Sequence, residues 1–300
     1  MRMKRYVCID IGGTSIKHGL ADEEGHILTR GQCPTRARED GAAGIVRKVI
    51  EIAGQYRASD RIEGVAVATA GIVDTENGSI VFAGERSFPG YTGTKLRASV
   101  EEACHVPCAV ENDVNAAGLG EYWLGAGRNA SSVFMMTVGT GIGGCFLLDG
   151  KVFHGAGGSA GEIGFLRVHG ENRIFEETAS TRALIERAAA ACGADAAKLT
   201  GEQIFQMAAE GRKDAAEAIE YMAERLAEGI SHVCCLLNPE VILLGGAVMS
   251  QEAYLRPLLE KHLEAMVLPV MRRGTRLEFA RLGNDAGMLG ALYFLRQRMK

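Results

Sequence analysis

Several features that mark other classes of protein are missing from this sequence. No apolar run approaches the roughly 18 residues of a membrane-spanning helix. The basic start Met1–Arg5 is followed by Asp10 too soon for the apolar segment of a signal peptide. Net charge is −4 and no basic block is longer than Met271–Arg273, so a nucleic-acid-binding surface is not expected. We therefore expect a cytoplasmic protein with neither a membrane nor a nucleic acid as a partner.

The cysteines also lack a recognisable pattern. The eight of them contain no CxxC pair, and their nearest spacings are Cys104 with Cys108 and the adjacent Cys234 and Cys235. This spacing does not indicate a disulfide framework. We expect reduced and mostly buried thiols, which are typical of the cytoplasm.

Proline is scarce and glycine abundant, with 6 prolines and 39 glycines in 300 residues. The glycines follow neither the triplet of collagen nor a polar low-complexity tract. They gather in short runs, which build turns that approach a ligand closely. Hydrophobic residues make up 47% and charged residues 23% of the chain, enough to form a substantial core.

Short apolar runs alternate with longer helical patterns, which predicts an α/β fold. Strands are expected at 6–11, 15–21, 62–69, 108–111, 132–138, 142–148 and 241–244, and helices at 41–56, 95–104, 114–124 and, with interruptions near Gly193 and Gly211, over 178–237. A strand, a Gly-Thr turn and a returning strand occur twice, around Thr14 and around Thr140. This repetition predicts two related lobes.

The first Gly-Thr turn carries a possible phosphate and metal site. In Asp10-Ile11-Gly12-Gly13-Thr14, a carboxylate ends a strand and is followed by two glycines and a hydroxyl. Glycines expose backbone N–H groups to phosphate, and a carboxylate can hold Mg²⁺ directly or through water. An ordinary hairpin turn is the alternative interpretation of this segment alone.

Two later glycine runs offer similar chemistry. Gly139–Gly144 contains no GxxxxGK[ST], and the strand-like run after it does not suit a dinucleotide-binding turn. A third run, Gly245-Gly246-Ala247, follows the strand expected at 241–244. The sequence thus presents three candidate contacts to a nucleotide.

Five segments in order resemble the ROK family of sugar kinases, within the actin–hexokinase–Hsp70 superfamily. They are Asp10–Thr14, Glu111–Asp113, Gly139–Gly144, Val241–Ala247 and Leu282–Ala291, and together they span essentially the whole chain. The resemblance implies a two-lobed actin-like ATPase (ribonuclease H-like) fold, each lobe a mixed sheet flanked by helices. It places residues 1–113 with 287–300 in an N-terminal lobe carrying the first phosphate hairpin and sugar-binding elements. Residues 114–286 would form a C-terminal lobe with the second hairpin and the adenosine-binding region.

The resemblance also assigns roles to individual residues, with Asp113 as the catalytic base. The residues implied in sugar binding are Gly71, Asn112, Asp113, Glu162 and Glu176, and a one-residue slip would exchange Glu176 with Glu177. Those implied in ATP binding are Asp10, Gly12, Gly13, Thr14, Lys17, Gly139, Thr140, Gly141, Gly245, Gly246 and Ala247, with Asp10 also on Mg²⁺.

The chain departs from the family pattern after Glu162. Family members commonly have histidine where this chain has Phe165, and a cysteine cluster where 166–179 has none. His154 and His169 cannot complete the about four ligands of a structural zinc site, so we expect no zinc. Phe165 replaces a polar contact with an aromatic face. This predicts altered recognition near the anomeric end of the sugar, as for a β-glucoside.

The resemblance implies an ATP- and Mg²⁺-dependent hexose kinase, forming a homodimer and acting on the 6-hydroxyl of glucose or a glucoside. N-acetylmannosamine, allose and fructose remain open as substrates. The family also includes sugar-responsive transcriptional regulators with an N-terminal DNA-binding module. We do not expect such a module here, because the first hairpin already begins at Asp10. A non-catalytic actin-like nucleotide-binding protein is the third alternative. Asp113 and Glu162 argue against it, because such a protein needs no sugar pocket.

Overall fold

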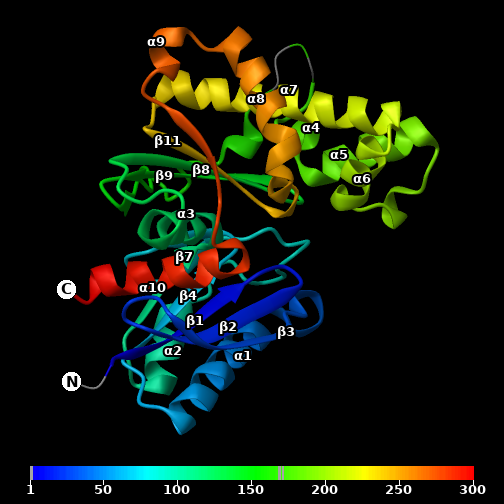
Figure 1. Ribbon diagram of the computed structural model, residues 1–300. Coiled ribbons are helices and arrows are strands. Elements are labelled where there is room, and N and C mark those ends of the chain that lie inside the picture. The colour runs from blue at the N-terminus through cyan, green and yellow to red at the C-terminus, as the bar shows by residue number, and fades with distance from the viewer. Residues whose placement is uncertain (1–2, 168–169, 171) are drawn as a thin grey trace. The chain divides into compact units, whose positions relative to one another are not determined.

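The computed structural model describes residues 3–167, 170 and 172–300, which divide into two compact units (Figure 1). The first unit contains the chain up to Arg128, Gly150–Ala160 and Asn284–Lys300, and the second contains Asn129–Asp149 and Gly161–Gly283. Each unit has a mixed sheet with flanking helices. The expected two-lobed α/β fold class is confirmed.

The sheet of the first unit brings three strand ends to one edge. Its strands lie in the order β3 (Ile27–Pro34), β2 (Ser15–Asp22), β1 (Arg5–Ile11), β4 (Gly64–Thr69) and β7 (Cys108–Asn112). β1 is antiparallel to β2 and parallel to β4, and β4 is parallel to β7. In register, Ile11 pairs with Thr69, which pairs with Asn112. The residues that follow these three strands therefore start from the same edge.

Two faces of this sheet are covered by different helices. The helices are α1 (Ala37–Ser59), α2 (Leu96–Cys104), α3 (Asp113–Leu124) and α10 (Ala286–Arg298), and a hairpin of β5 (Ile72–Asp74) and β6 (Ser79–Phe82) follows β4. Val7 and Ile9 of β1 share a buried core with Val49 of α1. Asp10 projects from the opposite face, because side chains alternate along a strand, and contacts α10 at Gly287.

The helices α3 and α10 pack backbone against backbone. A Cβ at Gly290 would lie 1.5 Å from the carbonyl oxygen of Ala116, and one at Gly120 would lie 2.4 Å from that of Ala286. Because α3 is held so closely to α10, it belongs to the first unit, which continues to Arg128. The lobe boundary expected from the sequence was placed earlier, after Asp113.

The second unit is built on strands that repeat part of this pattern. They lie in the order β9 (Ile142–Leu148), β8 (Ser132–Val138), β11 (Val241–Gly245) and β12 (Arg276–Phe279). β8 is antiparallel to β9 and parallel to β11, which is parallel to β12. The two-residue strand β10 (Lys151–Val152) lies in the segment assigned to the first unit.

The helices of the second unit form a large apolar core around α7. They are α4 (Glu176–Ala179), α5 (Thr181–Cys192), α6 (Gly201–Ala209), α7 (Lys213–Leu236), α8 (Glu252–Met266) and α9 (Pro269–Arg272). Met222, Leu226 and Ile230 follow one face of α7 and are buried. The breaks between helices have local causes, since Gly193 ends α5 in the left-handed conformation and Thr200 starts α6 with a capping box.

Two expectations about composition can be checked on these elements. In the described residues no helix has both the length and the apolar character needed to span a membrane. All eight cysteines are described, and all are free thiols, of which only Cys235 is classed as exposed.

The close approach of α3 and α10 predicts the effect of a single methyl group. Gly290→Ala should lower the free energy of unfolding by on the order of 3 kcal/mol, because its Cβ cannot fit without separating the helices. Gly54→Ala is the matched control, since that helical glycine meets nothing within 4 Å. It should raise stability by about 0.5–1 kcal/mol. Chemical denaturation would check both, and equal effects would contradict the packing argument.

Candidate active site

The hairpin between β1 and β2 leaves its tip accessible. The N–H of Gly12 donates to the carbonyl of Ser15 (3.0 Å), and the hydroxyl of Thr35 donates to the carbonyl of Gly12 (2.6 Å). Gly13 and Thr14 are exposed, and a Cβ at Gly13 would meet nothing within 4 Å. No contact in the described chain therefore requires glycine at 13, whereas a ligand that approaches the backbone closely would.

Asp10 lies just before this tip, in an environment that disfavours its charge. Burial, together with the negative charge of Asp113, raises the pKa of Asp10 to about 6, while Lys17 opposes the shift. Lys17 pairs with Asp10 across β1 and β2, and its Nζ donates to Oδ1 of Asn284 (2.8 Å). A desolvated carboxylate that one lysine only partly neutralises suits a hard divalent cation such as Mg²⁺.

The turn from β7 into α3 is organised by Asn112. Its Oδ1 accepts the N–H groups of Val114 (2.9 Å) and Asn115 (3.0 Å), so Asn112 is the N-cap of α3. Its Nδ2 donates to the carbonyl of Gly71 (3.0 Å) and to Oδ1 of Asp113 (3.0 Å). These four hydrogen bonds satisfy both donors and both lone pairs of the side-chain amide. A sugar hydroxyl bound by Asn112 would have to replace one of them.

Asp113 is the first residue of α3, and its carboxylate is held in place through one of its two oxygens. Its Oδ1 accepts from Nδ2 of Asn112 and from the N–H of Val114, both at 3.0 Å. Within the described chain these bonds go to Oδ1, which leaves Oδ2 as the oxygen available to a ligand. Burial raises the pKa of Asp113, and hydrogen bonds to its carboxylate oppose that shift. The group is thus a stronger base than an exposed aspartate.

Gly71 has a structural reason of its own to be glycine. Its φ is +102°, and a Cβ there would lie 2.5 Å from the carbonyl oxygen of Phe82. Its carbonyl orients the amide of Asn112. The structure therefore connects Gly71 with Asn112 and Asp113, as the sequence analysis grouped them.

In the second unit, the hairpin between β8 and β9 resembles the first. The N–H of Gly139 donates to the carbonyl of Gly141 (2.9 Å), and the N–H of Thr181 donates to the carbonyl of Gly139 (2.9 Å). Thr140 is exposed at the tip, and a Cβ at Gly139 would meet nothing within 4 Å. This tip is accessible in the same way as that of the first hairpin.

Glu176 lies directly against this second hairpin. Its Oε2 accepts the N–H of Ile142 (3.4 Å) and would be 2.5 Å from a Cβ at Gly141. The neighbouring Glu177 instead accepts the N–H of Ile174 (3.0 Å) within its own loop. Of the two candidate acids, Glu176 is the one beside the hairpin.

Glu162 is held on a segment that packs closely on β9. Gly161 has a φ of +97° and its Cβ would lie 2.3 Å from the carbonyl oxygen of Gly144, while a Cβ at Gly164 would lie 2.3 Å from that of Ile142. Glu162, between the two, is exposed. Phe165 follows, with 65% of its surface exposed.

The third glycine run also serves the fold of the second unit. Gly246 has a φ of +109°, and its Cβ would lie 2.1 Å from the carbonyl oxygen of Val138. A Cβ at Gly245 would lie 2.4 Å from the side chain of Met135. Packing alone therefore requires these glycines, and their role at an adenosine, like that of Ala247, stays a prediction.

The described residues offer no group of three or more His, Cys, Asp or Glu side chains arranged to hold a metal ion. His154 is bonded to Glu111 (2.8 Å), and His169 lies outside the described residues. The absence of structural zinc stays a prediction.

Sequence reasoning missed this His154–Glu111 pair, because Glu111 was noted only as part of a motif and His154 only as a histidine that could not complete a zinc site. The two are 43 residues apart. No local spacing indicates such a contact.

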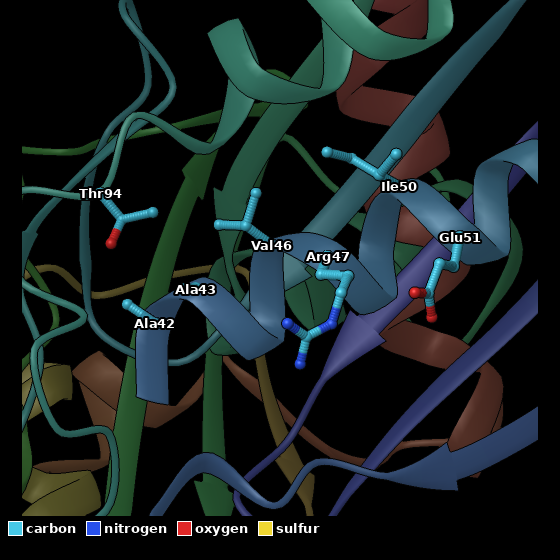
Figure 2. A pocket seen from close by; sticks show the side chains of 7 residues that line it. All are labelled: Ala42, Ala43, Val46, Arg47, Ile50, Glu51 and Thr94. Atoms are coloured by element: carbon cyan, nitrogen blue, oxygen red, sulfur yellow. The ribbon is translucent and has the colours of Figure 1, made fainter. Parts of the chain in front are cut away.

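A separate surface hollow lies beside α1. Its volume is about 460 Å³, and its lining residues, shown in Figure 2, are Ala42, Ala43, Val46, Arg47, Ile50, Glu51 and Thr94. None of them is a predicted site residue. The candidate site is therefore defined by the hairpins and strand ends and not by this hollow.

Two units with mixed sheets, each carrying an accessible glycine hairpin after its first strand, define a protein of the two-lobed actin-like class. The model of the ROK family matches residues 6–298. The glucokinase of Halalkalibacterium halodurans is 31% identical over 321 residues, covering 98% of this chain and 95% of that protein. The β-glucoside kinase of Listeria monocytogenes is 29% identical over 308 residues, covering 98% of each.

A solved structure agrees with these relatives. The ROK family glucokinase from Streptomyces griseus, crystallised in complex with glucose and AMPPNP, matches with a TM-score of 0.83 and 29% identity, over 98% of this chain and 99% of that one. The chain belongs to the ROK family and is similar to its glucokinases and β-glucoside kinases. The resemblance drawn from the motifs is thus confirmed.

The raised pKa of Asp10 predicts a stability effect whose sign depends on pH. Because the folded-state pKa of about 6 exceeds the ordinary 3.8, the penalty on folding grows as pH rises from about 3.8 to about 6 and is complete above that range. Without nucleotide or metal, Asp10→Asn should raise the free energy of unfolding by up to roughly 3 kcal/mol at pH 8. The gain should shrink at pH 5. Denaturant melts in EDTA would check this, and a gain independent of pH would contradict it.

Proposed function

We propose that this protein is an ATP-dependent sugar kinase that transfers the γ-phosphate to a hexose hydroxyl, the 6-hydroxyl of glucose or a glucoside. The observation that carries the proposal is the Asp113 carboxylate, fixed through Oδ1 at the start of α3 with a raised pKa. Similarity to glucokinases, one of them solved with glucose and AMPPNP, supports the same reaction.

In this reaction Asp113 acts as the general base. Its Oδ2 accepts the proton of the sugar hydroxyl as that oxygen forms a bond to the γ-phosphorus of ATP, and the bond from that phosphorus to the β-γ bridging oxygen breaks. The products are the sugar phosphate, ADP and a proton carried away by Asp113. Base catalysis of this kind contributes roughly 10²–10⁴-fold, and positioning with charge stabilisation supplies much of the rest.

The phosphates would be bound by the two accessible hairpins, through Gly12, Gly13 and Thr14 of the first unit and Gly139, Thr140 and Gly141 of the second. When bound, Mg²⁺ supplies positive charge that offsets the phosphates, and Asp10 is the residue that would hold it. Lys17, beside Asp10, adds a further positive charge. The adenosine would lie at Gly245, Gly246 and Ala247.

Sugar recognition is assigned to carboxylates and amides, which accept hydrogen bonds from hydroxyls and discriminate against analogues that lack them. The groups are Asn112 and Asp113 of the first unit and Glu162 and Glu176 of the second, with Gly71 as support. N-acetylmannosamine, allose and fructose are the alternative substrates of the same site. A homodimer in the cytoplasm is the expected form.

Replacing the base should separate turnover from nucleotide binding. Asp113→Asn keeps the shape of the side chain but cannot take up the hydroxyl proton, so sugar-dependent ADP release should fall by about 10²-fold or more. Affinity for an ATP analogue should change by less than about threefold, because the hairpins are untouched. Coupled ADP release and fluorescent-nucleotide titration would measure the two. Near-normal turnover would show that Asp113 is not the base.

The exposed aromatic ring of Phe165 predicts a preference among sugars. We expect aryl β-glucosides to be used at least as well as glucose, because an aromatic substituent can stack on Phe165. Phe165→His should lower kcat/KM for the aryl glucoside relative to glucose by about 3- to 10-fold. A panel of glucose, methyl and phenyl β-glucosides, N-acetylmannosamine, allose and fructose would measure this. Unchanged ratios in the variant would refute the role of Phe165.

A further inference from the structure

Glu111 is a fully buried carboxylate, and each of its oxygens is bonded. Oε1 accepts the N–H of Asn112 (2.7 Å) and Nδ2 of Asn115 (3.0 Å), and Oε2 is bonded to Nε2 of His154 (2.8 Å). The exposed fraction of the Glu111 side chain is 0%. A buried carboxylate is tolerated only when it is paired and hydrogen-bonded. When protonated, His154 is the positively charged partner available to it.

His154 comes from a different part of the chain from the other partners of Glu111. It lies in the segment Gly150–Ala160, and its carbonyl accepts the N–H of Ala160 (3.1 Å), which closes the glycine-rich loop between them. The hydrogen bond to Glu111 raises the pKa of His154, although partial burial opposes this. At longer range Glu76 raises this pKa and Arg298 lowers it. The pair therefore ties this loop to the end of β7.

The pair is connected to the base by consecutive hydrogen bonds. Glu111 accepts from His154 through one oxygen and from the N–H of Asn112 through the other. The side chain of Asn112 then donates to Oδ1 of Asp113. Glu111, when bonded to His154, thus fixes the backbone of Asn112. The side-chain amide of Asn112 in turn sets the orientation of the Asp113 carboxylate.

We propose that His154 is a positioning residue for phosphoryl transfer: its Nε2 hydrogen bond holds Glu111, and through Glu111 the turn that orients Asp113. The inference rests on the proposed kinase function, with Asp113 as the base. His154 itself need not contact sugar or nucleotide. Misplacing a catalytic group by about 1 Å can cost about 10²-fold in rate. Glu111 is only two residues from the base, so losing its bond to His154 is sufficient to lower the rate.

The ring nitrogen that makes the bond allows a matched pair of variants. Glutamine places its amide nitrogen near the position of Nε2, whereas asparagine places its amide near Nδ1. His154→Gln should therefore keep the bond to Glu111, and His154→Asn should lose it. His26→Gln is the control elsewhere in the same unit, because His26 bonds the buried Asp22 through Nδ1 (2.9 Å) and glutamine would lose that bond.

The experiment measures kcat, the KM for ATP and the melting temperature of each variant. We expect His154→Asn to lower kcat by about 10- to 100-fold with the KM for ATP within about twofold of the wild type. His154→Gln should retain kcat within about threefold, and His26→Gln should turn over like the wild type even if its melting temperature falls. Glutamine has one acceptor oxygen where glutamate has two, so Glu111→Gln cannot accept hydrogen bonds from both Asn112 and His154 as the carboxylate does. It should lower kcat as His154→Asn does. It keeps the test decisive if His154→Asn fails to fold.

Several outcomes would overturn the inference. Wild-type kcat in folded His154→Asn or in Glu111→Gln would show that the pair only stabilises the fold. An equal loss in His154→Gln and His154→Asn would show that the hydrogen bond is not what matters. These results are distinct from failure of the proposed function, which would appear as no sugar-dependent ADP release by the wild type with any sugar of the panel.

Discussion

Three carboxylates lie at the carboxyl edge of the first unit's sheet, and neighbouring groups must offset their negative charge. Asp10 at the end of β1, and Glu111 and Asp113 at the end of β7, start from strands that the parallel register aligns. Lys17 partly neutralises Asp10, His154 pairs with Glu111, and Asp113 begins a helix, whose N-terminus favours a carboxylate. Burial outweighs these favourable contacts, because the pKa values of Asp10 and Asp113 remain raised.

The glycines divide into two groups with different physical causes. Those at 120, 246 and 290 are required by the protein itself, since a Cβ would collide with a carbonyl oxygen within the same unit. A Cβ added at Gly13 or Gly139 would meet nothing within 4 Å, so packing within the protein does not require glycine there. Both lie at or beside an exposed hairpin tip. Only the second group points directly to a ligand. A glycine-rich composition thus reflects close helix packing as well as phosphate binding.

The sequence predicted best what depends on short stretches of chain. Both Gly-Thr hairpins were located because an apolar strand pattern precedes each turn and a second strand pattern, alternating in β2 and largely apolar in β9, follows it. The strands β8 and β9 were placed at their observed bounds. The role of Asp113 came from a family motif, since a single aspartate after a strand is not distinctive. The first compact unit continues to Arg128, past the lobe boundary expected after Asp113, because the contact of α3 with α10 joins residues far apart in sequence. The pairing of His154 with Glu111 was missed for the same reason.

The uncompensated charge at Asp10 has a consequence for the relation between stability and function. A buried carboxylate of raised pKa makes the folded protein less stable near neutral pH than a neutral residue would. A divalent cation carried by ATP would remove that penalty, so binding of the nucleotide would stabilise the first unit beyond the contacts made by its hairpin. His154 and Glu111 differ, because each is already bonded to the other within the chain. In the proposed kinase, the first unit would therefore hold Asp113 in place without a ligand, while the region around Asp10 would reach full stability only with the proposed nucleotide and cation bound.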